Sequence, residues 1–79
     1  MEYTHKIVGI GPQDCFYTLH FAEKLLGKSC RIMNIQGDFD NLPGYQSANI
    51  YLEEGLEGEK DEFYAFYQVK LEKIEEETE

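Results

Sequence analysis

The order of hydrophobic and polar positions predicts a chain built mainly of β-strands. Residues 5–10 (HKIVGI) are rich in β-branched side chains and are followed by Gly11 and Pro12. Because proline cannot donate a hydrogen bond to a strand ladder, the first strand should end there. Residues 29–35 (SCRIMNI) have the same β-rich character and predict a second strand.

Two further strands are predicted in the second half of the chain. Residues 46–53 alternate between apolar and polar positions, the period of a strand with one buried face. Residues 63–74 give the strongest strand pattern, and one of their faces should carry Phe63, Ala65, Tyr67, Val69 and Leu71. The segment between them, residues 53–62 (EEGLEGEKDE), is hydrophilic and predicts a long hairpin loop.

One short helix is predicted between the first two strands. Within residues 15–26 the apolar side chains recur at helical spacing and should face the core: Phe16, Leu19, Ala22, Leu25 and Leu26. Asp14 is a suitable N-cap residue. Gly27 can take the left-handed conformation that ends many helices.

These elements predict a single mainly β domain over residues 1–74, followed by a frayed acidic tail, residues 75–79. An antiparallel sheet of four or five strands must curl or be covered to bury one face. With one short helix available, a small, partly open barrel of the SH3 type is the most economical fold. An α+β fold, in which the helix covers an antiparallel sheet, is the alternative.

Several short elements recur in a known group of proteins. They are the run Asp14-Cys15-Phe16-Tyr17, the run at residues 25–28 (LLGK), a strand beginning at residues 44–45, and residues 63–65 (FYA) leading to residues 69–72 (VKLE). In these the chain resembles small uncharacterised SH3-like-barrel proteins of Gram-positive bacteria and their phages. It departs from them at residues 66–68, which are inserted between the last two elements. The resemblance implies an SH3-like barrel and carries over no catalytic residue.

Charge is concentrated at one end of the sequence. The chain carries a formal net charge of −9, of which residues 53–79 contribute −8, from eleven acids and three bases. Phosphate recognition needs a net basic face, so direct binding to nucleic acid or to an anionic membrane is not expected. No secretory leader pattern is present, and two cysteines are too few for a disulfide framework, which favours a cytoplasmic location.

The acidic segment is the first candidate site. It comprises Glu53, Glu54, Glu57, Glu59, Asp61 and Glu62. These side chains could simply keep a hairpin soluble. Alternatively, they could compete with nucleic acid for a basic groove, each carboxylate taking the place of a phosphate.

A second candidate site is cationic and aromatic. Lys24, Lys28 and Arg31 lie near the predicted end of the helix, where cations complement the helix dipole. Together with Tyr17 or Tyr45, they could hold a small anion such as a nucleotide through charge and stacking.

No catalytic, cofactor or metal site is predicted. The cysteines Cys15 and Cys30 and the histidines His5 and His20 lack the paired spacing of zinc ligands. Cys30 alternates with Ile32 on a strand and should be a small core residue.

The sequence therefore predicts a non-enzymatic, acidic protein-interaction domain that docks on a protein with a basic surface. A phage or mobile-element inhibitor of a nucleic-acid-binding or defence protein would fit this size and charge. The alternatives are a binder of small anions such as nucleotides and a subunit of a larger assembly. The pattern leaves open the partner, the oligomeric state and which face of residues 63–74 is buried.

Overall fold

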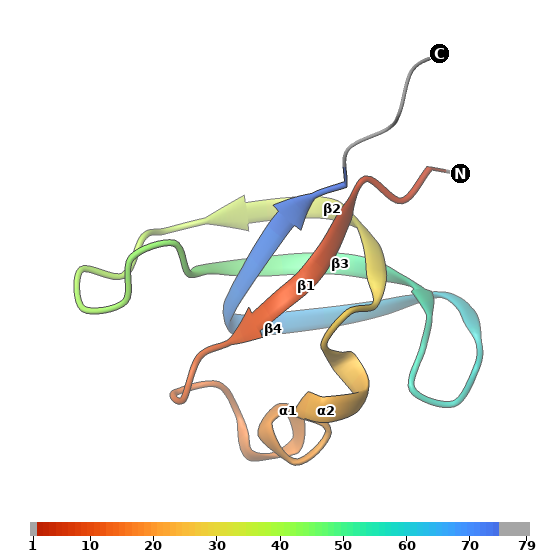
Figure 1. Cartoon of the computed structure of the whole chain (residues 1–79), viewed down its shortest axis with the longest axis horizontal. Coiled ribbons are helices and arrows are strands. Elements are labelled where there is room, and N and C mark those ends of the chain that lie inside the picture. Colours follow the sequence, from red (N-terminus) through yellow and green to blue (C-terminus); the bar gives the residue numbers. More distant parts are fainter. Residues whose placement is uncertain (1, 75–79) are drawn as a thin grey trace.

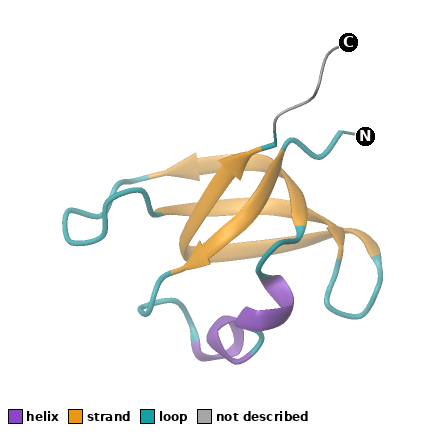
Figure 2. Cartoon of the chain, in the orientation of Figure 1, coloured by secondary structure: helices purple, strands orange, loops and turns teal. Residues whose placement is uncertain are grey.

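The computed structural model describes residues 2–74, and in these residues the fold is mainly β, as predicted. Four antiparallel strands are present: β1 (His5–Ile10), β2 (Ser29–Gln36), β3 (Gln46–Glu54) and β4 (Lys60–Lys73). Two short helices, α1 (Phe16–His20) and α2 (Ala22–Leu25), connect β1 to β2 (Figure 1). The helices lie together on one side of the strands (Figure 2). The predicted tail, residues 75–79, lies outside the described residues.

The sheet closes on itself, because every strand has a neighbour on both sides. The ladder runs from β1 through β2 and β3 to β4, and β4 returns to β1. The β2–β3 and β3–β4 ladders run along most of these strands. By contrast, β1 meets β2 only through the pairs His5–Cys30 and Lys6–Ser29. Three of the four ladders of the ring are thus long, whereas the β1–β2 ladder, called the seam below, is short.

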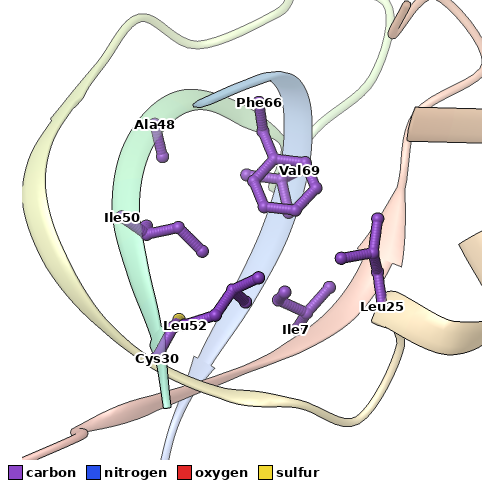
Figure 3. Packing of buried hydrophobic residues seen from close by; sticks show 8 residues of the cluster. All are labelled: Ile7, Leu25, Cys30, Ala48, Ile50, Leu52, Phe66 and Val69. Carbon is purple, nitrogen blue, oxygen red and sulfur yellow. The ribbon is translucent and has the colours of Figure 1, made fainter. Parts of the chain in front are cut away.

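The core lies inside this ring and is small. Its fully enclosed side chains come from all four strands and from α2 (Figure 3): Ile7, Leu25, Cys30, Ala48, Ile50, Leu52, Phe66 and Val69. The apolar face predicted for residues 46–53 is confirmed, since Ala48, Ile50 and Leu52 all belong to this core. Cys30 is buried, also as predicted.

The predicted helix is broken into two, and its apolar stripe does not face the core. Phe21 separates α1 from α2 and has backbone angles of φ −102° and ψ 19°. Only Leu25 of the five predicted core side chains is fully buried, and Phe16 is 84% exposed. Nine helical residues on the side of a ring offer the core only about one turn, so the remaining apolar side chains stay in solvent. Gly27, at φ +90°, follows α2 and allows the chain to turn into β2.

The predicted capping role of Asp14 is wrong. The residue that precedes α1 is Cys15, and no side chain caps the helix. The Asp14 carboxylate is instead buried against β4, where it accepts hydrogen bonds from the backbone N–H groups of Tyr67 and Gln68 at 2.9 Å each.

The prediction that Phe63, Ala65, Tyr67, Val69 and Leu71 share one face of the last strand is wrong. Tyr64 and Phe66 point inward there, while Phe63, Ala65 and Tyr67 are exposed. Beyond this point Gln68 and Val69 are buried one after the other. Residues 46 and 48 of β3 pair with residues 69 and 66 of β4, so β4 holds one extra residue, a β-bulge. The bulge exchanges the two faces of the strand, so Val69 and Leu71 point inward while Phe63, Ala65 and Tyr67 point outward.

The β3–β4 connection is shorter than the predicted loop. The strands extend to Glu54 and from Lys60, which pair with each other. The turn is closed by a 2.7 Å hydrogen bond from the Gly55 N–H to the Glu59 carbonyl. The acidic residues of this region therefore lie on a defined hairpin.

Candidate interaction surface

Four of the six predicted acidic site residues form a group of exposed carboxylates on the β3–β4 hairpin. Glu53 and Glu54 end β3, and Glu57 and Glu59 lie in the turn; all four are exposed. Figure 1 shows this hairpin projecting from the ring on the side opposite the β2–β3 connection. These four residues, Glu53, Glu54, Glu57 and Glu59, are called the acidic hairpin below.

The fifth predicted acid, Asp61, is engaged by its own chain. The Arg31 guanidinium donates two hydrogen bonds to it, Nε to Oδ1 and Nη2 to Oδ2, both at 3.0 Å. Tyr3 donates a third from its hydroxyl at 3.1 Å. Arg31 therefore holds the pKa of the Asp61 carboxyl below its ordinary value. Asp61 is also the only non-glycine with positive φ among the described residues, at 56°.

The sixth predicted acid, Glu62, supports the hairpin turn. Its Oε1 accepts a hydrogen bond from the Leu56 N–H at 3.2 Å, and the side chain packs directly against Gly55. Asp61 and Glu62 thus stabilise the structure next to the acidic hairpin, and their charges are only partly presented to solvent.

Aromatic side chains that the sequence analysis did not select lie next to these acids. The Arg31 guanidinium stacks over the Tyr51 ring at 4.1 Å from its centroid. Tyr51 meets Phe63 edge to face, with 5.5 Å between ring centroids. These two aromatics are paired across β3 and β4 on the outside of the ring and are called the outer aromatic pair below.

The alternation of residues 46–53 already placed Tyr51 outside, so this half of the outer aromatic pair could be found from sequence. Phe63 could not, because the pattern of residues 63–74 left open which of their faces is buried. Phe63 is 49% exposed, a large value for a phenylalanine in a strand. Its face is set by its pairing with Tyr51 on β3, which local pattern does not report.

The five residues of the predicted anion site are not brought together around one space. Tyr17 and Lys24 each contact Phe21 within the helical segment, at 4.9 Å between ring centroids and 5.7 Å from Nζ to centroid. Arg31 is paired with Asp61. The Tyr45 hydroxyl lies against Gly9 of β1.

The remaining member of that set, Lys28, lines an open depression of about 630 Å³ between the end of α2 and the hairpin. Glu53, Glu54 and Lys60 line it too. Two carboxylates and two ammonium groups share this wall, so an anion bound there would meet like charge as well as opposite charge. The arrangement gives no selective attraction for a nucleotide.

A polar chain connects α1 to the core. Cys15 Sγ lies 3.2 Å from Thr18 Oγ1, which in turn lies 3.0 Å from the Tyr64 hydroxyl. Burial raises the pKa of Tyr64, opposed in part by its hydrogen bond to Thr18. Residues 2–74 bring together no group of three His, Cys, Asp or Glu side chains that could hold a metal ion.

The helices among residues 2–74 are too short and too polar to cross a membrane.

Comparisons with known proteins add no relative. The chain matches no protein-family model, no curated protein and no solved structure.

Proposed function

We propose that this chain is a non-enzymatic, acidic protein-interaction domain that docks on a protein with a basic surface. One observation carries the proposal: the acidic hairpin lies beside the outer aromatic pair of β3 and β4, in which Phe63 is exposed and Tyr51 is half-buried. Glu53 follows Tyr51 by two positions on β3, so the two side chains leave the strand on the same side.

Solubility explains the carboxylates but not the aromatic rings. A solvated hairpin needs only charge, whereas leaving half of a phenylalanine ring in water forgoes stabilisation of about 25 cal/mol for each Å² left unburied. Protein interfaces have the composition seen here, with aromatic and Arg side chains at the centre and charged side chains at the rim. The geometry therefore fits a docking surface with Phe63 and Tyr51 as anchors and the acidic hairpin as rim.

The proposed partner is a protein with a basic groove, such as a nucleic-acid-binding or defence protein. Carboxylates on a projecting hairpin can take the positions of phosphates, and the net charge of −9 would steer the two proteins together. In this proposal the chain is a phage or mobile-element inhibitor of the SH3-like type that acts in the cytoplasm. The closed ring of four strands and the short chain support that fold assignment.

The test is affinity capture from a lysate of the cells in which the protein occurs, followed by titration of the purified partner. The charge-reversed variant Glu57→Lys/Glu59→Lys is compared with Glu23→Lys/Asp40→Lys, which changes net charge equally at exposed sites outside the hairpin. We expect the hairpin variant to lose binding and the control to keep most of it. Wild-type affinity should fall steeply as salt rises.

A second pair of variants tests the aromatic centre of the proposed interface independently of its charged rim. Phe63→Ala should raise the dissociation constant at any salt concentration, whereas Phe16→Ala, at the most exposed aromatic of α1, should not. A partner whose binding ignores salt and tolerates the hairpin variant would exclude the proposal. So would the absence of any retained protein with a basic surface.

A further inference from the structure

The second half of β2 has an unpaired edge. The seam with β1 ends at Cys30, whereas the ladder with β3 continues from Cys30 to Gln36. Figure 1 shows β2 running on past the point where β1 crosses it. Among the described residues, no other strand pairs with residues 32–36 on that side. Half of the backbone N–H and C=O groups of this stretch therefore face away from the sheet.

This edge has one feature that usually protects a free strand, a bulge at Met33, but lacks the others. Residues 32–36 (IMNIQ) contain no proline and no charged side chain. Two large apolar side chains are exposed on it, Met33 at 57% and Ile35 at 39%. The ladder with β3 shifts register between Ile32 and Asn34, which leaves Met33 as the extra residue of a bulge. The rest of the edge is available for pairing.

We propose that a second copy of this chain pairs with this edge, β2 against β2 in antiparallel orientation, to form a two-fold symmetric dimer. Unpaired strand groups are satisfied by an extended segment, and residues 32–36 are themselves such a segment, β-branched and uncharged. Antiparallel pairing of identical strands is self-complementary, because residue i of one copy meets residue j of the other, and j meets i, across a two-fold axis.

The distribution of charge along the chain favours the same edge of β2 for pairing. The chain carries −9 overall, yet residues 32–37 hold no ionisable side chain. Two copies that pair along this edge therefore bring no charged side chain of residues 32–37 against one another. The free end of β2 and the acidic hairpin lie at opposite sides of the ring (Figure 1), so the dimer leaves the proposed docking surface uncovered.

The salt dependence of binding distinguishes this dimer from docking on a basic partner. Two copies of −9 repel one another, so added salt should strengthen the dimer by screening that repulsion. Docking on a basic partner should weaken under the same conditions. The dimer can therefore fail while the proposed function stands, and the reverse also holds.

The experiment is sedimentation equilibrium of the purified chain over a range of concentrations, at about 0.05 M and about 0.5 M salt. We expect the mass to rise from 9.2 kDa toward twice that value with concentration, and to rise further at the higher salt. Amide hydrogen exchange should show protection of residues 32–36 that grows with concentration. A monomer at both salt concentrations, with exchange independent of concentration, would overturn the proposal.

The variants Met33→Lys and Ile35→Lys place a cation on the edge, and each lowers the magnitude of the net charge by one. Any loss of the dimer therefore cannot come from greater overall repulsion. Each should weaken the dimer by about tenfold or more, because the two-fold axis then brings a cation from each copy onto the same short ladder. Phe16→Lys makes the same charge change at an exposed apolar side chain of α1 and should leave the dimer intact.

Two outcomes point to other occupants and contradict the proposal. If Phe16→Lys abolishes the dimer and both β2 variants keep it, the contact between the two copies lies at α1. A chain that stays monomeric, but whose captured partner is lost in Met33→Lys, assigns the edge to an extended segment of that partner.

Discussion

Oδ2 of Asp14 accepts a hydrogen bond from the buried backbone N–H of Gln68, 54 residues along the chain, at 2.9 Å. The same oxygen accepts the Tyr67 N–H, and Oδ1 accepts the N–H of Cys15. The bulge in β4 leaves two successive N–H groups without a partner strand, and this one carboxylate satisfies both. By holding the bulge, Asp14 determines which residues of β4 face the core.

Replacing Asp14 tests this role. Asp14→Ala removes the acceptor for three N–H groups, two of them on the bulge, and should lower the free energy of unfolding by about 3 kcal/mol. Asp14→Asn keeps one oxygen but presents an amide N–H₂ to a donor, so it should cost about 1–3 kcal/mol. Urea unfolding followed by far-UV circular dichroism measures both changes.

Exposed acids provide the control for the Asp14 variants. Asp40→Ala and Glu23→Ala also remove one carboxylate each, and both should change stability by less than about 0.5 kcal/mol. If Asp14→Ala behaved like these surface variants, the carboxylate would not be what holds the bulge.

Gly11 is required by the same junction. Its N–H donates to the Gln68 carbonyl at 2.9 Å, and a Cβ at this position would stand 2.5 Å from the Gln68 Cβ. The Gln68 side chain cannot move away freely, because it is buried and its Oε1 accepts the Gln13 N–H at 3.0 Å. Gly11→Ala should therefore destabilise the fold by about 1–3 kcal/mol in thermal unfolding.

A double variant identifies the clashing side chain. Gln68→Gly/Gly11→Ala removes the Cβ, Cδ and Oε1 atoms of Gln68 that the new Cβ would meet, so the two changes should be strongly non-additive. Additive losses would show that Gly11 is needed for some reason other than its contact with Gln68.

Local pattern predicted the strands well, for a physical reason. Runs of β-branched residues between glycines and turn residues report how each segment fits a pleated surface, and the start of all three strands before β4 was placed correctly. It failed where a contact distant in sequence overrides the local period. The faces of β4 depend on Asp14, and the exposure of Phe16 depends on how little of the helical segment reaches the core.

The candidate site was predictable in composition but not in geometry. The acidic segment is visible in the sequence because charge is a local property. That Asp61 is paired with Arg31, 30 residues away, depends on the register of β2, β3 and β4 together. The alternation of residues 46–53 placed Tyr51 correctly, whereas the pattern of residues 63–74 left the face of Phe63 open.

The Arg31–Asp61 pair predicts sensitivity to acid. The pKa of Asp61 is lowered in the folded state from its ordinary value of 3.8, mainly by its hydrogen bonds with Arg31. The unfolded chain therefore takes up the proton first as pH falls. The stability that the pair contributes is complete above the ordinary pKa and is lost as pH falls through the lower, folded pKa.

Asp61→Asn tests that sign, because asparagine tolerates the positive φ at this position and carries no charge. Melting temperatures measured from about pH 6 to about pH 2 should fall less in this variant than in the wild type. Glu59→Gln, which changes an exposed and unpaired acid of the described hairpin, should keep the wild-type slope. Equal slopes for Asp61→Asn and the wild type would contradict the assignment.

The two cysteines should differ sharply in reactivity. Cys15 is exposed, whereas Cys30 is completely buried and burial raises the pKa of its thiol to about 11. A thiol reagent at neutral pH should therefore modify one cysteine quickly and the other only when the chain opens. Cys15→Ser should remove the fast phase and Cys30→Ala the slow one; two fast phases would contradict the burial of Cys30.

The raised pKa of Cys30 also predicts a loss of stability in alkali. The unfolded thiol ionises near its ordinary value of 9.0, whereas the folded one stays protonated up to about pH 11. Between these values the unfolded state releases a proton that the folded state retains, so the free energy of unfolding must fall as pH rises. Burial also raises the pKa of Tyr64, which adds to the same trend.

Chemical denaturation at a series of pH values should show a shallower decline in the free energy of unfolding for Cys30→Ala than for the wild type, whatever the stability of the variant at neutral pH. Cys15→Ser is the matched control and should keep the wild-type slope; an unchanged slope in Cys30→Ala would show that the buried thiol is not the group that titrates.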